Sequence, residues 1–246
     1  MNPVAIRFEV VPFVLVTALL FALLGLALWR KGCPARRVAW FCGLPALVLV
    51  GYLLYFFRDP ERTPPSEADA VVAGADGTVA AITEVYEGRY LKTPCVRISI
   101  FLSLFDVHVN RAPISGTSSF RGYFPGRRLF TFQEKSSEVN QHNKILIAGE
   151  RTRCLVCQIV GPVCRRVVYW LPHDRPVEIA IGERIGMMKF GSRLDIYLPA
   201  DDVKVLVTPG TTVRAGETVV ARISRTHPRI SEAPTEGPPT TAGAAR

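Results

Sequence analysis

The chain has 246 residues, a hydrophobic content of 48% and a formal net charge of +9 at pH 7. This length allows one compact domain with a sizeable core, together with appendages. The basic balance is not accompanied by basic runs interleaved with aromatic residues, which argues against nucleic-acid binding. Next to a membrane segment, the same charge favours attraction to anionic lipid headgroups.

Two uncharged apolar stretches, residues 10–29 and 38–57, dominate the N-terminal part of the chain. Each has about the 20 residues that a helix needs to cross a bilayer core. The segment RKGCPARR between them is a short basic turn. Residues 1–57 are therefore predicted to form a membrane hairpin of two apolar helices. A cleaved signal peptide fits poorly, since two spans follow one another and the first lacks a strongly basic start.

From residue 58 to residue 226 the composition is that of a soluble β-rich domain, with short apolar runs separated by Gly, Pro and Asp. Residues 71–82 and 205–223 resemble the hairpins of biotinyl and lipoyl domains, although no attachment lysine motif is present. The predicted fold is mainly β, a biotinyl/lipoyl-like flattened β-sandwich that follows the N-terminal transmembrane helical hairpin. Residues 227–246, rich in Pro, Thr, Ala and Gly, are predicted to form a disordered tail.

The six cysteines form no recognisable metal-binding pattern. Cys154 and Cys157 make a single CxxC, and a zinc site usually needs a second ligand pair at suitable spacing. The segment around them is apolar and strand-like, so buried thiols are predicted and no metal is expected. The remaining cysteines are Cys33, Cys42, Cys95 and Cys164.

Gly191 and Ser192 lie between an apolar segment and the strand-like run RLDIYLP. A Gly-Ser pair alone is a common turn dipeptide. Its chemistry is nevertheless specific, because a glycine carbonyl can be approached closely and a deprotonated serine hydroxyl can attack it. The resulting ester can eliminate to a dehydroalanine, which hydrolyses to a pyruvoyl group with a reactive ketone.

Such an attack needs a base, and the chain has four histidines. His227 lies in the predicted tail, His173 in an exposed turn, and His142 in a polar segment that fits either a surface or a site. His108 differs, because it ends an apolar strand-like run just before a Pro-Gly turn. Asp76 is the carboxylate predicted to orient it, as in a serine–histidine–aspartate triad. A structural hydrogen-bonding role for His108 is the alternative.

Five motifs occur in the order seen in the short form of the phosphatidylserine decarboxylases, and the chain resembles that family from about residue 56 to residue 223. The motifs are FFRDPER, ADGTV, FLSLFDVHVNRAPISG, KSSEVNQHN and KFGSRLDIYLP. Five ordered motifs are far more specific than any one of them.

The resemblance implies a zymogen that cuts itself between Gly191 and Ser192. A larger β chain then ends at Gly191, and a small α chain starts with the pyruvoyl cofactor made from Ser192. Asp76, His108 and Ser192 match the family's processing residues. The implied reaction decarboxylates phosphatidylserine to phosphatidylethanolamine and CO2 through a Schiff base with the pyruvoyl ketone. Longer members carry two histidines near the position of His108, so this histidine serves both steps or His142 takes one of them.

The resemblance also implies a bacterial inner-membrane enzyme with its catalytic domain on the cytoplasmic side. The positive-inside rule argues the other way, because it places the basic turn in the cytoplasm and both termini outside. A shallow hairpin in one leaflet is a further alternative. Lys189 and Arg193 are candidates to attract the substrate's phosphate or carboxylate, with ordinary solvated charges as the alternative.

Two other classes of function fit parts of the sequence. A membrane-anchored biotinyl-like adaptor explains the hairpin but not the ordered histidine and Gly-Ser motifs. A pyruvoyl decarboxylase acting on another serine-containing lipid, or on a soluble amino acid, keeps the chemistry, although two spans argue against a soluble substrate. A homo-oligomer is compatible with either class.

Overall fold

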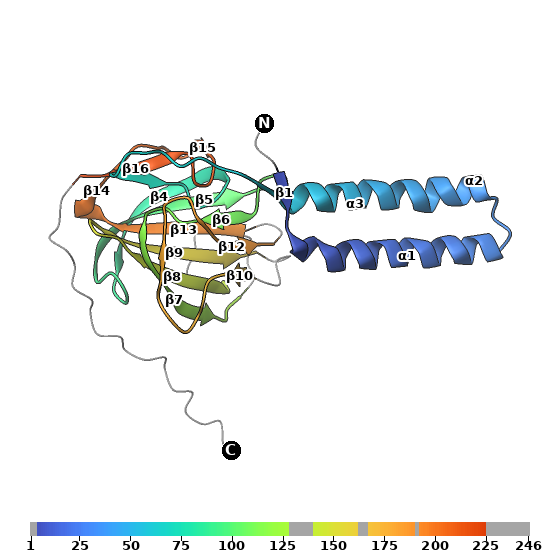
Figure 1. Cartoon of the computed structure of the whole chain (residues 1–246), viewed down its shortest axis with the longest axis horizontal. Coiled ribbons are helices and arrows are strands. Elements are labelled where there is room, and N and C mark those ends of the chain that lie inside the picture. The colour runs from blue at the N-terminus through green and yellow to red at the C-terminus, as the bar shows by residue number, and fades with distance from the viewer. Residues whose placement is uncertain (1–3, 128–139, 162–166, 190–191, 225–246) are drawn as a thin grey trace, which may run out of the picture.

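The computed structural model describes residues 4–127, 140–161, 167–189 and 192–224. An N-terminal helical hairpin extends from a β domain (Figure 1). The hairpin consists of strand β1 (Val4–Ile6), a short 3-10 turn (Phe8–Val10), α1 (Val11–Arg30), α2 (Ala35–Val38), a π-helical turn (Ala39–Gly43) and α3 (Leu44–Phe56).

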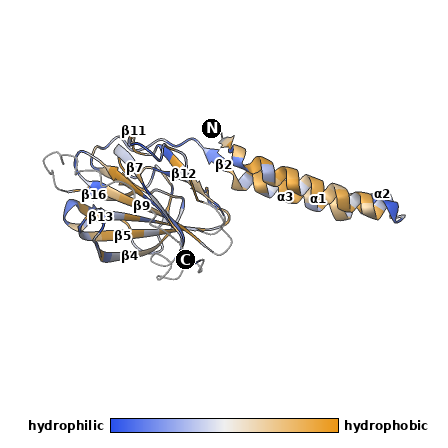
Figure 2. Ribbon diagram, turned by 90° about the horizontal axis from the view of Figure 1, so that it is seen from below, coloured by the Kyte–Doolittle hydropathy of each residue, from blue (hydrophilic) through white to orange (hydrophobic). Residues whose placement is uncertain are grey.

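The two arms of the hairpin confirm the predicted apolar helices. Phe8–Arg30 and Ala35–Phe56 have mean hydropathies of 2.7 and 1.9 and the length to cross a membrane. Only 17% and 11% of their most apolar segments are buried. Figure 2 shows hydrophobic residues along both arms, with a hydrophilic α2 at the far end. Exposed apolar surface of this extent marks a site of interaction with a membrane or another protein.

The arms pack closely because Gly25 leaves room between them. A Cβ on Gly25 would lie 3.3 Å from Val38 Cγ1 and 3.8 Å from Cys42 Cβ. Small residues at such contacts let helices approach closely where water does not drive their association. Gly32, with φ +84°, turns the chain after α1 ends at Arg30.

The β domain is built on an eight-stranded antiparallel sheet in the order β11-β7-β8-β9-β13-β5-β4-β15. Two three-stranded sheets, β10-β12-β6 and β14-β16-β3, accompany it, and β1 pairs with β2. The strands are β2 (Arg58–Pro60), β3 (Ala70–Val72), β4 (Gly77–Glu87), β5 (Thr93–Leu102), β6 (Val109–Arg111), β7 (Gly116–Phe124), β8 (His142–Ala148), β9 (Arg153–Val160), β10 (Val167–Tyr169), β11 (Val177–Ile179), β12 (Arg184–Met188), β13 (Ser192–Pro199), β14 (Val203–Val205), β15 (Thr212–Val213) and β16 (Val219–Ile223).

The mainly β fold and the hairpin are thus as predicted. The two segments that resemble biotinyl hairpins lie against each other, because β3 pairs with β16 and β4 pairs with β15. The closer likeness to biotinyl and lipoyl domains stays a prediction, as do the domain boundaries. The tail predicted at residues 227–246 lies outside the described residues.

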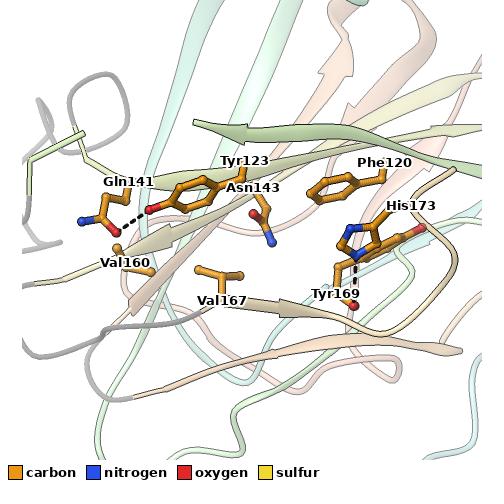
Figure 3. A pocket seen from close by; sticks show the side chains of 8 residues that line it. All are labelled: Phe120, Tyr123, Gln141, Asn143, Val160, Val167, Tyr169 and His173. Atoms are coloured by element: carbon orange, nitrogen blue, oxygen red, sulfur yellow. Dashed lines mark hydrogen bonds between the residues drawn. The ribbon is translucent and has the colours of Figure 1, made fainter. Parts of the chain in front are cut away.

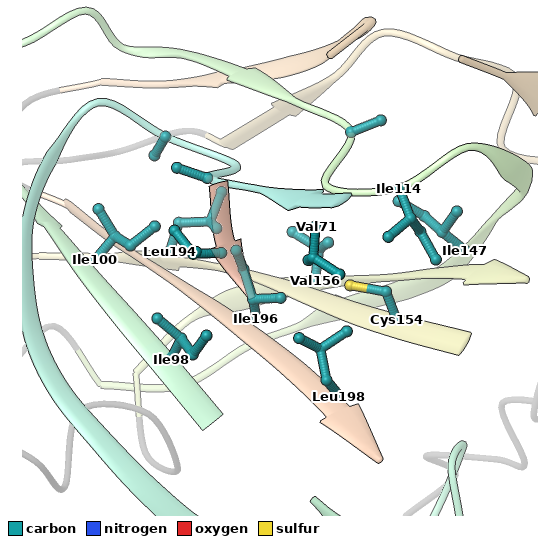
Figure 4. Packing of buried hydrophobic residues seen from close by; sticks show 14 of the residues in the cluster. Val71, Ile98, Ile100, Ile114, Ile147, Cys154, Val156, Leu194, Ile196 and Leu198 are labelled. Atoms are coloured by element: carbon teal, nitrogen blue, oxygen red, sulfur yellow. The ribbon is translucent and has the colours of Figure 1, made fainter. Parts of the chain in front are cut away.

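The main core lies on one face of the large sheet. Leu194, Ile196 and Leu198 of β13 point into it beside Ile98 and Ile100 of β5 (Figure 4). Because side chains alternate along a strand, every second residue of β13 belongs to this face.

A second, smaller cluster covers the opposite face and holds two of the thiols. Cys95 and Cys157 are buried there among Leu91, Leu155 and Ile159. Burial raises the pKa of Cys95 to about 11 and that of Cys157 to about 12. These thiols are protonated at neutral pH. The burial of Cys157, and of Cys154 in the main core, is as predicted, and Cys164 lies outside the described residues. Within residues 4–127, 140–161, 167–189 and 192–224, no cluster of three His, Cys, Asp or Glu residues could hold a metal.

Candidate active site

Ser192 is the first residue of β13, a central strand of the large sheet. It lies opposite Leu102 of β5 and Val160 of β9. Its side chain is on the same face as that of Leu194, because residues i and i+2 of a strand share a face. Ser192 is fully buried, and its Oγ has no hydrogen-bond partner in the described part of the chain. Gly191, the other half of the predicted cleavage site, lies outside the described residues.

His108 is also fully buried, directly before β6. Its ring lies 4.1 Å from the ring of Phe56, the last residue of α3, measured between centroids. Its Nδ1 is 2.9 Å from the main-chain oxygen of Asp106, and its own main-chain oxygen accepts a hydrogen bond from Met188 N at 3.1 Å. The other ring nitrogen, Nε2, is buried and has no partner among the described groups.

These contacts determine the protonation state of His108. A carbonyl oxygen can only accept a hydrogen bond, so Nδ1 carries the proton and Nε2 carries the lone pair. Burial lowers the pKa of His108 from 6.5 to about 4, which keeps the ring neutral at pH 7. A neutral imidazole with a buried, unpartnered lone pair is in the protonation state that a general base needs to accept a proton.

The fold brings His108 and Ser192 to the same end of the large sheet by two routes. Leu102 lies opposite Ser192, and the short turn 103–107 leads from it to His108. The second link is the main-chain hydrogen bond from Met188 N to His108 O, since Ser192 lies only four residues after Met188 in the chain. The Asp106 carboxylate holds the turn by accepting hydrogen bonds from Ser103 N and Ser103 Oγ, both at 2.7 Å.

Asp76 lies at the same end of the sheet but has other partners. It precedes β4, whose Thr78 lies opposite Phe101, so β5 separates Asp76 from β13. Its carboxylate forms an ion pair with Arg62 at 2.8 Å and accepts a hydrogen bond from Ala215 N at 2.7 Å. Burial raises the pKa of Asp76 despite these contacts.

The orienting contact predicted between Asp76 and His108 is therefore replaced by the main-chain oxygen of Asp106. No hydrogen bond joins Asp76 to His108, both of which the structure describes. A main-chain acceptor does the same work as a triad aspartate in selecting the tautomer, without adding a charge to the buried site. A role for Asp76 in processing stays a prediction.

A buried amide chain, which the sequence analysis missed, reaches this region. Asn143 Nδ2 donates to Gln158 Oε1 at 3.2 Å, and Gln158 Nε2 donates to Asn110 Oδ1 at 2.8 Å. Asn110 Nδ2 is buried without a partner in the described chain. Gln158 lies opposite Leu194, on the face of the sheet that also carries Ser192. The only sequence signal was a pair of polar amides inside apolar strands, HVN and CQI.

Gly186 of β12 lies where the hydrogen-bonded amides pass closest to that strand. A Cβ on Gly186 would lie 2.2 Å from the main-chain oxygen of Val168 and 2.9 Å from Gln158 Nε2. Any larger residue would displace the strand or the amide. Gly186 therefore maintains the close approach that positions Gln158 against Asn110.

His142 and His173 are arranged differently from His108. His142 lies opposite Ile159, which lies opposite Arg193, so its side chain is on the face of the sheet away from Ser192. This placement argues against His142 acting on Ser192. His173 is exposed, as predicted, and stacks on Phe120 at 4.2 Å. His227 lies outside the described residues.

The two cations suggested as substrate contacts have unequal surroundings. Arg193 is 3% exposed, forms an ion pair with Asp195 at 2.9 Å and faces away from Ser192, which removes the alternative of a solvated charge. Lys189 is half-buried, and its Nζ lies 5.4 Å from the Phe13 ring and 5.7 Å from the Phe57 ring, at the base of the hairpin. Of the two cations, only Lys189 lies at the base of the hairpin, and its role in binding substrate stays a prediction.

Arg111 follows His108 by three residues and is the last residue of β6. It is buried, donates to the main-chain oxygens of Gly182 and Pro60 at 2.9 Å, and pairs with Asp59 at 3.3 Å. Asp59 directly follows the hairpin, so Arg111 fixes the hairpin to the β domain.

A cavity of about 370 Å³ opens beside the end of the large sheet at which Ser192 lies (Figure 3). Asn143 and Val160 connect it to the site, since Asn143 begins the amide chain and Val160 lies opposite Ser192. Its lining is aromatic and polar, and consists of Phe120, Tyr123, Gln141, Asn143, Val160, Val167, Tyr169 and His173.

Comparisons with known proteins identify the family. The model of the phosphatidylserine decarboxylase family matches residues 50–221. The phosphatidylserine decarboxylase proenzyme of Carboxydothermus hydrogenoformans is 43% identical over 187 residues, which cover 76% of this chain and 86% of the relative. The proenzyme of Symbiobacterium thermophilum is 41% identical over 191 residues (77% and 87%), and that of Salinibacter ruber is 44% identical over 192 residues (75% and 83%). The chain belongs to the phosphatidylserine decarboxylase family.

Proposed function

We propose that this protein decarboxylates phosphatidylserine to phosphatidylethanolamine, with a pyruvoyl group that it makes from its own Ser192. One arrangement carries the proposal: a buried serine hydroxyl and a buried neutral imidazole nitrogen, neither with a hydrogen-bond partner among the described residues, lie on segments that meet at Leu102 and Met188. Buried polar groups are almost always paired. The buried Ser99 Oγ also lacks a partner among the described residues, so the combination of an unpaired hydroxyl with an unpaired base nitrogen carries the assignment. The names of the relatives agree with this assignment.

Self-cleavage begins when His108 Nε2 takes the proton of Ser192 Oγ. The oxygen attacks the Gly191 carbonyl carbon, the peptide C–N bond breaks as His108 returns the proton to the leaving nitrogen, and an ester then links Gly191 to the side chain of Ser192, whose amine is free. Removal of the Ser192 Cα proton then breaks the Cβ–O bond and releases the Gly191 carboxylate. Water hydrolyses the remaining dehydroalanine to the ketone and ammonia.

Asn110 is the candidate donor for the oxyanion that develops on the Gly191 oxygen. Its Nδ2 is buried and unpaired within the described part of the chain, and its Oδ1 accepts a hydrogen bond from Gln158. A preorganised donor in a dry site stabilises developing negative charge far more than it would in water.

The ketone, once formed, supplies an electrophile for the amine of the lipid headgroup and accepts the electrons released when CO2 leaves. The protein's own residues prepare the surroundings. Phe56 covers His108 and excludes water, and His108 Nε2 holds the proton that returns to the substrate carbon. Lys189 attracts the phosphate or carboxylate of the headgroup at the hairpin base.

A membrane hairpin suits an enzyme whose substrate stays in the bilayer. It keeps the site beside the membrane, and we propose the cytoplasmic face of a bacterial inner membrane as its location. An adaptor module without catalysis has no use for an unpaired buried serine and histidine. Among pyruvoyl decarboxylases, two apolar helices favour a lipid over a soluble amino acid.

The experiment that tests the proposal measures CO2 release from phosphatidylserine by the purified protein, comparing Ser192→Ala with Ser99→Ala. Ser99 is a matched control, because it is also buried with an unpaired Oγ but lies opposite Asp195, on the other face of the sheet. The Ser192 variant is expected to stay uncut and inactive, and the Ser99 variant to be cut and active. CO2 release by Ser192→Ala would overturn the pyruvoyl assignment.

A further inference from the structure

The turn at residues 103–106, between β5 and His108, exposes two neighbouring apolar side chains. Leu104 is 46% exposed and Phe105 is 66% exposed. The other large hydrophobic residues exposed on the described β domain, Tyr86, Tyr123 and Leu206, are isolated from one another in the sequence. Single exposed apolar residues need no explanation, but an adjacent pair on a short turn does.

The turn is bonded to the C-terminal part of α3. Tyr52 Oη donates to the Leu104 main-chain oxygen at 3.3 Å, and Tyr55 Oη donates to that of Phe105 at 3.2 Å. Arg58 Nη2 donates to the same Phe105 oxygen at 2.7 Å. Since a helix rises about 1.5 Å per residue, Tyr52 lies about 6 Å before the end of α3 at Phe56. The turn therefore lies beside the last turn of the apolar helix, not beyond it.

Tyrosines and an arginine at this position are typical of the layer where a span meets lipid headgroups. Just below that layer, in the hydrocarbon region, main-chain polar groups need partners within the protein. The carbonyls of the turn have them, and the Asp106 carboxylate fixes the start of the turn through Ser103. Leu104 and Phe105 are thus presented on a rigid, internally bonded turn.

We propose that Leu104 and Phe105 insert into the interfacial layer of a phospholipid bilayer, beside the second arm of the hairpin. The contact is continuous with the apolar surface of α3, and it holds the catalytic end of the sheet at headgroup depth. The same turn joins Leu102, which lies opposite Ser192, to Asp106, whose carbonyl binds His108.

The experiment uses the full chain in phospholipid vesicles, with an environment-sensitive fluorophore attached at Phe105→Cys. Tyr86→Cys is the control, because Tyr86 is 70% exposed and lies opposite Pro94, at the far end of the β4–β5 ladder from Phe101 and Thr78. Both variants carry Cys33→Ala, which removes the half-buried thiol between the arms. Lipids carrying bromine or nitroxide quenchers report the depth of the fluorophore.

The expected result is a blue-shifted emission at position 105 that the lipid quenchers reduce, with neither effect at position 86. Leu104→Cys is a second probe of the same turn, in case Phe105→Cys does not fold, and it is expected to behave like position 105. Water-like emission without quenching at the turn position, equal to that at position 86, would overturn the proposal. The readout needs no catalysis, so it can fail or succeed independently of the proposed decarboxylation.

Discussion

The main-chain oxygen of Asp106 lies 2.9 Å from Nδ1 of His108. This contact assigns the proton to Nδ1 and leaves the lone pair on the buried Nε2. A base prepared in this way needs no neighbouring carboxylate. The charge of Asp76 is instead neutralised by Arg62, on the other side of β5.

The depressed pKa of His108 predicts how stability depends on pH. The unfolded residue binds a proton near its ordinary pKa of 6.5, whereas burial lowers the folded pKa to about 4. The folded state therefore binds fewer protons between these values, and stability falls as the pH decreases from 6.5 towards 4. The loss attributable to His108 is at most about 3 kcal/mol.

This pH dependence is measured by thermal or denaturant unfolding in detergent, in a Ser192→Ala background that keeps all chains uncut. Adding His108→Gln is expected to remove the His108 contribution and flatten the curve between pH 4 and pH 6.5. An unchanged curve would mean that His108 titrates normally in the folded chain.

A comparison of two histidine variants tests the base. His108 and His142 are both buried, and each has its Nδ1 next to the main-chain oxygen two residues before it. Only His108 is proposed to act on Ser192. His108→Gln is expected to slow self-cleavage by at least about 100-fold, the usual contribution of a general base. His142→Gln is expected to leave cleavage unchanged.

Cleavage is followed by denaturing electrophoresis during cell-free synthesis with vesicles. Equal slowing in the two histidine variants would assign the loss to general destabilisation. Slowing in His142→Gln alone would move the base to the opposite face of the sheet.

A second pair of variants tests the amide chain. Asn110→Ala removes the unpaired Nδ2 donor, whereas Asn143→Ala removes a donor from the far end of the chain and leaves the Gln158–Asn110 bond in place. Loss of one oxyanion donor is expected to slow cleavage about 100-fold in Asn110→Ala. Asn143→Ala is expected to be cut at nearly the normal rate. If both are cut normally, Asn110 stabilises the fold and not the reaction.

The attachment of the hairpin depends on Asp59. Its side chain is 2% exposed and contacts Arg7, Arg111 and Arg184 at 3.6, 3.3 and 2.7 Å. Asp59→Ala leaves these cations without their shared partner, and removing one member of a buried ion pair destabilises a protein by about 3–5 kcal/mol. A clear drop in the unfolding temperature in detergent is expected.

The matched control is Asp69→Ala, whose ion pair with Arg222 has side chains that are 32% and 41% exposed. Solvent screens such a pair, so its loss is expected to change the unfolding temperature little. Similar unfolding temperatures for the Asp59 and Asp69 variants would contradict a buried clamp at the hairpin exit.

The sequence predicted the parts of the fold that follow from local patterns. The hairpin was predicted from two uncharged runs of helical length, and the strands were predicted from short alternating runs. The order of strands in the large sheet was not predictable, because pairings such as β13 with β5 and β9 join segments far apart in the chain. The burial of the Arg193–Asp195 ion pair was missed for the same reason, because it depends on other segments covering that face of the sheet.

For the candidate site, the sequence identified Ser192 and His108 but not the contact that prepares the base. A side chain can be recognised by its type, whereas a main-chain acceptor such as the Asp106 oxygen carries no sequence signal. Asn110 was overlooked as a donor because its significance lies in an unpaired Nδ2, which appears only when the surrounding strands are in place.

The central claim is that the chain cuts itself before Ser192 and converts that residue into a pyruvoyl group. Intact-mass analysis of the purified active protein tests it most directly. The predicted result is two chains, residues 1–191 and 192–246, the smaller one lighter by one ammonia than the same peptide beginning with serine. A single uncut chain in preparations that release CO2 from phosphatidylserine would contradict the account.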